Sequence, residues 1–163
     1  MLINKKIVML QRVQSIYLFL ASLAIFALFL FPLVHNVYVD NKPTTVMVTG
    51  TYQDVNGQQT QIDHFVALTA VTGIAALIPL VIIFLFKNRK QQIALCYSAM
   101  LLIIGYSFWI AQASKAVVGD ITLQTNNYGI GMVLCPLAIV FLLLAIKGIQ
   151  RDEKLIKSAD RLR

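Results

Sequence analysis

The stretch IYLFLASLAIFALFLFPLV, from Ile16 to Val34, decides the fold class of this sequence. It contains no charged residue, and about 20 mostly apolar residues let a helix cross the roughly 30 Å hydrocarbon core of a bilayer. Basic residues precede it, as they precede a secretory signal. However, the run is longer than a signal-peptide core and ends without a small-residue cleavage site. We therefore expect an uncleaved membrane anchor.

Three further apolar runs follow, from Phe65 to Phe86, from Ile93 to Ala113 and from Ile130 to Ile146. None shows the alternation of polar and apolar residues that is typical of barrel strands. The sequence therefore predicts an all-α integral membrane protein with four transmembrane helices in an up-down bundle. We expect residues 1–163 to form a single membrane domain, with helices over 13–34, 65–86, 93–113 and 130–149.

The composition of the whole chain leads to the same class. Of its 163 residues, 58% are apolar and 13% are charged, and the mean hydropathy is +0.75. A soluble domain usually has about 25% charged residues. The charges are too few to cover a water-facing surface, which excludes a soluble globular fold, a disordered chain and a collagen-like fibre.

The basic residues predict the topology, because Lys and Arg gather in short cytoplasmic segments of membrane proteins. Twelve of the fourteen lie in the N-terminal segment, the link between the second and third runs, and the tail. Only Lys42 and Lys115 fall on the other side, so we expect both termini in the cytoplasm. The net charge of +7 thus reflects orientation and anionic headgroups, and we expect no nucleic-acid partner.

The first outer loop, residues 35–64, carries a hairpin signal. A β-branched run from Thr44 to Tyr52 precedes an Asn56-Gly57 turn and a second polar strand from Gln58 to Ile62. Val37 to Val39 is a candidate third strand. These features predict a small extracytoplasmic sheet, which is either a lid that ties helix ends together or a binding surface.

The second outer loop, residues 114–129, reads as a strand over Ile121–Thr125 followed by a turn. An isolated hairpin is only marginally stable in water. We therefore expect the two outer loops to share one small sheet.

The cytoplasmic tail, residues 150–163, has a helical spacing of apolar residues at Leu155, Ala159 and Leu162. It is either an amphipathic helix on the membrane surface or an extension of the fourth span. It serves as a topology anchor or as a docking site. The candidate cytoplasmic docking residues at the two ends of the chain are Gln11, Arg12, Gln14, Arg151, Asp152, Glu153, Lys154, Lys157 and Arg161.

The spans offer little chemistry. They contain no Asp, Glu, Lys, Arg or His, and ionisable residues at membrane depth are what usually mark ion or proton paths. Cys96 and Cys135 lie at different depths, so we expect packing residues and no disulfide. His35 and His64 bracket the first outer loop, but their spacing matches no metal-ligand motif. We expect no metal, no cofactor and no enzyme, because no catalytic motif is present.

One face of the second span is built of small residues. Thr69, Thr72, Gly73 and Ala76 recur at i, i+3, i+4 and i+7, and such faces let helices approach closely in lipid. The face either packs inside the bundle or binds a separate membrane protein. Pro79 and Pro136 lie within spans and can kink them.

The two ends of the chain resemble a known family. Residues 9–18, MLQRVQSIYL, and residues 151–163, RDEKLIKSADRLR, are similar to the opening and closing signatures of domain-of-unknown-function family 4293, and residues 86–93 are similar to its inner link. The resemblance implies a small four-pass protein in the cytoplasmic (inner) membrane of Bacteroidota, with no assigned activity. Family members typically begin near Met9, which makes Met1–Val8 either an extension or a misplaced start.

These observations predict a non-enzymatic structural or accessory subunit of an envelope complex, with the lipid bilayer and another membrane protein as its partners. The alternative is a transporter or channel component for a neutral or lipidic small molecule. That alternative requires a groove lined by Thr69, Thr72, Ser107 and Gln112. An enzyme acting on lipid or quinone is a third reading, with only the His35 and His64 region to support it.

Overall fold

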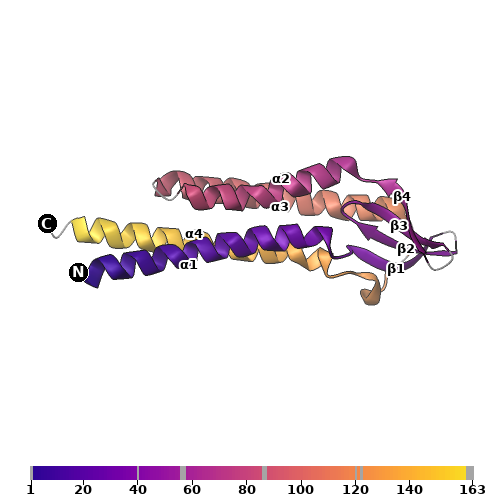
Figure 1. Cartoon of the computed structure of the whole chain (residues 1–163), viewed down its shortest axis with the longest axis horizontal. Helices are drawn as coiled ribbons and strands as arrows, with labels where there is room; N and C mark the ends of the chain where they lie inside the picture. Colours follow the sequence, from indigo (N-terminus) through magenta and orange to yellow (C-terminus); the bar gives the residue numbers. More distant parts are fainter. Residues whose placement is uncertain are drawn as a thin grey trace.

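Four α-helices and one antiparallel sheet make up the described part of the computed structural model. The structure describes residues 2–39, 41–55, 58–85, 88–119, 121 and 123–160. It describes the side chains of residues 13–39, 41–54, 58–85, 88–119, 121, 123–155 and 158. The start of α1, the end of α4 and the adjoining ends of α2 and α3 lie together at one end, here called the terminal end (Figure 1). The sheet lies at the opposite end, here called the sheet end. The helices are α1 (Leu2–Phe26), α2 (Val66–Phe84), α3 (Arg89–Val118) and α4 (Gly131–Asp160).

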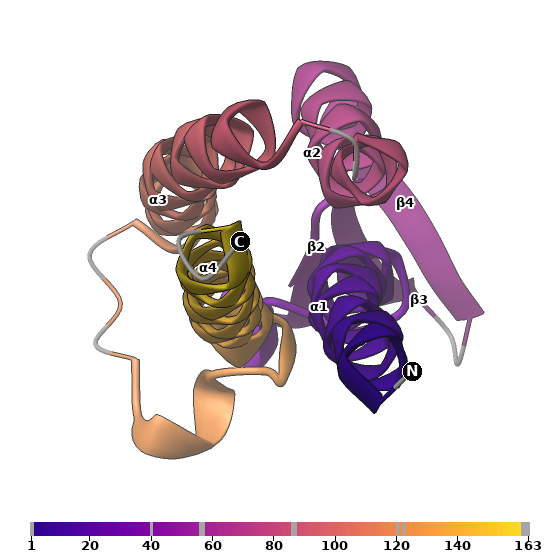
Figure 2. The same ribbon diagram turned by 90° about the vertical axis from the view of Figure 1, so that its left-hand side faces the viewer.

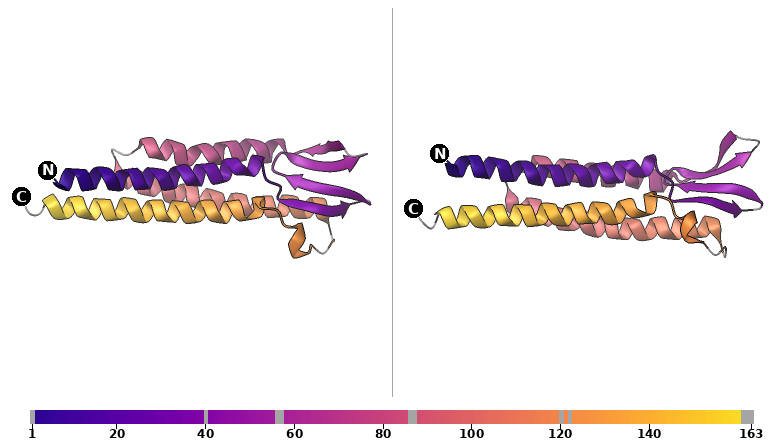
Figure 3. Two further views of the ribbon diagram at one scale, coloured as in Figure 1. Left: turned by 60° about the horizontal axis from the view of Figure 1, so that its bottom comes forward. Right: turned by 90° about the horizontal axis from the view of Figure 1, so that it is seen from below.

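The helices form a ring in which each one packs against two neighbours. Viewed along the long axis, α1 lies between α2 and α4, and α3 closes the ring (Figure 2). The most extensive contact between helices joins α1 to α4, which run antiparallel side by side (Figure 3). Buried alanines such as Ala21, Ala75 and Ala138 permit this close approach.

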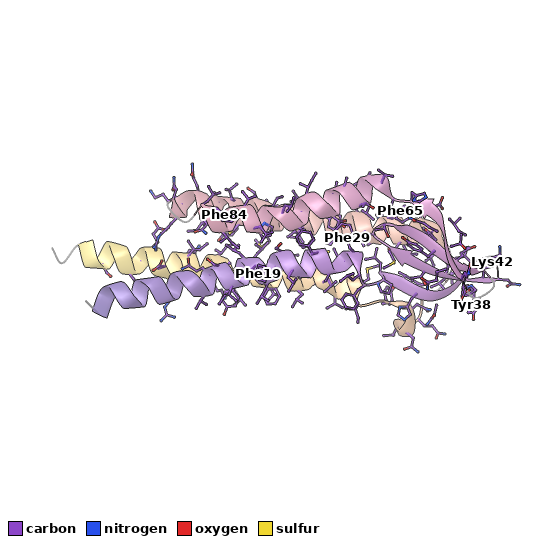
Figure 4. The ribbon with its side chains drawn as sticks, viewed as in Figure 1. Phe19, Phe29, Tyr38, Lys42, Phe65 and Phe84 are labelled. Carbon is purple, nitrogen blue, oxygen red and sulfur yellow. The ribbon has the colours of Figure 1, made fainter. Side chains whose placement is uncertain are left out.

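Three helical segments, Val66–Phe84, Arg89–Val118 and Gly131–Leu155, are long and apolar enough to cross a membrane. The apolar segment Val13–Phe29 is shorter, and it combines the described apolar part of α1 with a short 3₁₀ helix, η1 (Ala27–Phe29). Large apolar side chains cover the outward surfaces of the helices, as Phe19 and Phe84 illustrate in Figure 4. These features indicate a membrane protein.

The prediction of an all-α class with a small lid is wrong, because a four-stranded antiparallel sheet is part of the fold. Its order is β1-β2-β3-β4. Val34, Val37, Val46 and Val48 of this region belong to the same buried core as the helices. A sheet that shares its core with the bundle is built into the fold. The strands are β1 (Val34–Val39), β2 (Lys42–Met47), β3 (Gly50–Val55) and β4 (Gln58–His64).

The sheet exceeds the predicted hairpin because the run Thr44–Tyr52 is divided into two strands. A turn at Val48 and Thr49 separates β2 from β3. Gly50 then adopts φ +152°, and a Cβ there would lie 1.9 Å from the Asp63 carbonyl oxygen. The predicted Asn56-Gly57 turn lies outside the described residues.

Two connections differ from the sequence-based expectation. The first helix ends at Phe26 rather than near Val34, and the chain continues through a 3₁₀ helix over Ala27–Phe29. The Leu33 amide then donates to the Val46 carbonyl at 2.8 Å, and β1 begins at the next residue. The described part of the second outer loop adds no strand to the sheet. It forms a short 3₁₀ turn, η2 (Thr125–Asn127), and a single bridge between Val34 and Tyr128.

Candidate functional site

A buried polar cluster lies at the terminal end of the bundle. It consists of Gln14, Arg89, Gln92 and Asp152, and we call it the terminal-end polar cluster. Each member is buried except Arg89, whose side chain is 21% exposed. The other buried polar side chains of the described helices are hydroxyls, on Ser22, Thr72 and Ser114. Because buried polar groups need partners, the larger amide and charged groups of this cluster are the ones that most require specific contacts.

Arg89 and Asp152 form an ion pair between the first residue of α3 and the distal part of α4. Asp152 follows the buried Ile149 by three positions, so it continues the buried face of α4. Removing one partner of a buried pair leaves an uncompensated charge, which makes the pair structurally important. The pair fastens the start of α3 to α4.

Two further contacts join neighbouring helices at the terminal end. The Gln92 amide donates to the Ile82 carbonyl at 3.1 Å and so ties α3 to the last turns of α2. Gln14 of α1 packs on Gly148 of α4, where a Cβ would lie 2.9 Å from the Gln14 Cγ. Gly148 and Asp152 are four residues apart and therefore lie on one face of α4.

Basic side chains lie on α4 beside the buried Asp152. Lys147, Arg151 and Lys154 are exposed, and their spacing of i, i+4 and i+7 places them on one side of α4. We call these three residues the basic stripe. The helix therefore presents positive charge outward while it buries Asp152.

The structure separates the predicted docking residues into different environments. Gln14 and Asp152 are buried, Glu153 is half-buried, and Arg151 and Lys154 are exposed. The side chains of Gln11, Arg12, Lys157 and Arg161 lie outside the described residues. The docking residues predicted from the sequence do not include Arg89, because the chain pattern alone does not show that the start of α3 reaches α4.

The four residues of the predicted small-residue face of α2 lie in different environments. Thr72 and Ala76 face the interior, where the Ser22 hydroxyl donates to the Ala76 carbonyl at 2.6 Å and Thr72 hydrogen-bonds the Tyr106 hydroxyl. Thr69 donates to the Val48 carbonyl near the sheet at 3.1 Å. At Gly73 a Cβ would meet no atom within 4 Å, so this position is open.

The histidines and cysteines lie apart. His35 is on β1 and His64 ends β4, which are the two edges of the sheet. Three strand spacings of about 4.8 Å separate these edges. Cys96 and Cys135 are buried and free. Among the residues that the structure describes, no group of three or more His, Cys, Asp and Glu could hold a metal ion.

The fold and this site define a membrane protein in which apolar helices share one core with a terminal β-sheet. The chain belongs to the family described as Domain of unknown function (DUF4293), whose model matches residues 10–162. This confirms the resemblance that the two ends of the sequence indicate. A comparison with curated proteins found no match.

Proposed function

We propose that this chain is a non-enzymatic accessory subunit of a complex in the bacterial inner membrane, and that it docks an acidic partner protein through the basic stripe. The observation that carries the proposal is the exposure of all three basic side chains of the stripe on a helix that buries Asp152. The Arg89–Asp152 pair holds this part of α4 against the start of α3, at the base of the segment where α1 and α4 extend beyond the paired ends of α2 and α3 (Figure 1). A braced helix with an exposed cationic side is suited to recognition.

The proposed orientation places the terminal end in the cytoplasm. Among the described residues, the basic residues of the first part of α1, of the start of α3 and of the last part of α4 belong to that end, whereas Lys42 and Lys115 belong to the sheet end. Positive residues favour the cytoplasmic side. Since α1 runs beside α4 for most of its length, we propose that it also crosses the membrane, which makes four passes.

The interior supports a structural role better than transport. Thr72 pairs with Tyr106, the Ser107 hydroxyl donates to its own helix at the Ile104 carbonyl, and Gln112 is exposed. These side chains do not face one common groove. A groove of about 440 Å³ between α2 and α3 is lined almost wholly by apolar residues, including Leu77, Val81 and Leu102, so it offers no polar path.

Co-purification from native membranes in mild detergent tests the proposal. The double variant Arg151→Glu/Lys154→Glu reverses two exposed charges and leaves Asp152 in place. Truncation at Gly148 is less informative, because it also removes the ion pair with Arg89. The matched control is Lys42→Glu/Lys115→Glu, which reverses two exposed charges at the sheet end.

We expect a stoichiometric partner with the unmodified chain and with the control, and its loss from the stripe variant. Equal recovery of the partner with both variants would refute docking through the stripe. If vesicles with anionic lipid retain the chain through the stripe and no protein partner appears, the stripe is a topology anchor.

A further inference from the structure

A hollow of about 460 Å³ lies between the sheet and the last turns of α3. It forms because α3 continues to Val118 and runs alongside the sheet, past the start of α4 (Figure 3). On the helix side the wall is made of Ala113, Ala116 and Val117, whose spacing places them on one face. These short side chains leave the space unfilled.

The sheet side of the hollow is polar. Thr44 pairs with Gln53, and Thr51 pairs with Asp63, across neighbouring antiparallel strands. Residues that oppose each other in such a ladder project to the same face. All four line the hollow, so hydroxyl, amide and carboxylate groups face the small residues of α3.

Thr51 has a hydroxyl that lacks a partner. The residue is 4% exposed, and within the described part of the chain nothing hydrogen-bonds its Oγ1. The neighbouring Thr44 hydroxyl, by contrast, donates to the Lys42 carbonyl at 3.1 Å. A buried hydroxyl without a partner is unfavourable, and a bound polar group would relieve that cost.

The charge of the lining favours one class of ligand. Asp63 is the single ionisable side chain among the described residues that line the hollow, and its negative charge attracts a cation and repels an anion. Val39, Ile62 and Phe65 complete the lining with apolar surface suited to a hydrocarbon segment. Figure 4 shows Phe65 at the junction between the helices and the sheet.

We propose that this hollow binds an amphiphile that carries a primary ammonium group on an apolar chain. The ammonium group lies between the Asp63 carboxylate and the Thr51 hydroxyl, where its N–H groups find two acceptors. The apolar chain follows Ala113 and Ala116 along α3. An aminophospholipid headgroup and a free alkylamine share this chemistry, and the site is independent of docking at the opposite end of the molecule.

The test compares n-hexylammonium with n-hexanoate as probes of the full chain in a neutral detergent, read out as the midpoint of thermal unfolding. We expect hexylammonium to raise the midpoint and hexanoate to leave it unchanged. Asp63→Asn should weaken hexylammonium binding at least about tenfold, since it removes a charge-assisted bond. Asp54→Asn is the matched control, because this exposed acid on β3 does not line the hollow.

Thr51→Val provides a second variant that should fold. It replaces an unpartnered hydroxyl, so the unliganded midpoint should not fall, while hexylammonium binding weakens roughly three- to tenfold. The proposal is overturned if hexanoate stabilises the chain as well as hexylammonium does. It is also overturned if Asp63→Asn binds hexylammonium like the unmodified chain.

A second measurement identifies the source of the ammonium group. Native mass spectrometry follows the lipid retained from bilayers of equal phosphatidylethanolamine and phosphatidylglycerol. Retention of phosphatidylethanolamine that is lost in Asp63→Asn assigns a lipid ligand. Hexylammonium binding without a lipid preference assigns a free amine, and Asp63-dependent retention of phosphatidylglycerol contradicts the site.

Discussion

Arg89 at the first turn of α3 and Asp152 near the end of α4 form an ion pair whose carboxylate side chain is 1% exposed. The two residues are far apart in the sequence, and each lies in a segment rich in basic residues. Their pairing means that one acid of the tail is a structural partner, while the basic residues beside it remain outside. The terminal end is therefore held by a specific contact.

Asp152→Ala should destabilise the chain by about 3 kcal/mol, the lower end of the range for breaking a buried pair, because Arg89 is partly exposed. Thermal unfolding in detergent measures this change. The exchanged pair Arg89→Asp/Asp152→Arg should recover part of the loss. Lys90→Ala, at an exposed neighbouring position, should shift stability by less than about 0.5 kcal/mol. Equal effects of Lys90→Ala and Asp152→Ala would contradict the assigned role.

Gly148→Ala should cost about 1–3 kcal/mol, since its Cβ would approach the Gln14 Cγ to 2.9 Å. The combination with Gln14→Ala should remove much of that cost, and a double-mutant cycle on unfolding free energies measures the coupling. Strictly additive effects would show that α1 and α4 do not meet at this point.

Gly50→Ala should destabilise the sheet by about 3 kcal/mol, because the position combines positive φ with a backbone clash. Gly73→Ala is the contrasting variant, since its Cβ would meet nothing within 4 Å. It should stabilise α2 by up to about 1 kcal/mol. If Gly73→Ala keeps that stability but loses a co-purified partner, the open part of the α2 face is an intermolecular contact.

Tyr106→Phe should cost about 0.5–1 kcal/mol, the usual range for a hydrogen bond between membrane helices. The loss is modest because the Thr72 hydroxyl still donates a hydrogen bond to the Leu68 carbonyl at 2.7 Å. Unfolding of Tyr106→Phe, Thr72→Val and the double variant gives the coupling energy. Absence of coupling would mean that the two hydroxyls do not interact in the folded bundle.

The apolar runs predicted the helices of this fold because crossing a bilayer requires long uncharged segments. The extent of the sheet was harder to predict. The β-branched composition of Thr44–Tyr52 is suited to one strand, and the turn inside it is followed by Gly50, where a Cβ would clash with the Asp63 carbonyl oxygen. That contact arises from strand pairing and leaves no local signal.

The candidate site was predictable in part for the same reason. The tail pattern pointed to the region of Asp152, and the spacing of Lys147, Arg151 and Lys154 follows from helical periodicity. The partner of Asp152 depends on how far α3 and α4 overlap, which is set by tertiary packing. The hollow beside Thr51 likewise depends on how far α3 extends past the start of α4, which is also set by tertiary packing.

The most direct test of the docking proposal is photo-crosslinking in native membranes, with a photoreactive amino acid at position 154 or, as the control, at position 115. Both lysines are exposed, at opposite ends of the molecule. From position 154 we predict one discrete adduct, which contains the same partner protein that co-purifies with the chain. From position 115 we predict no protein adduct. Lipid adducts alone at position 154, or the same protein adduct from both positions, would contradict docking through the basic stripe.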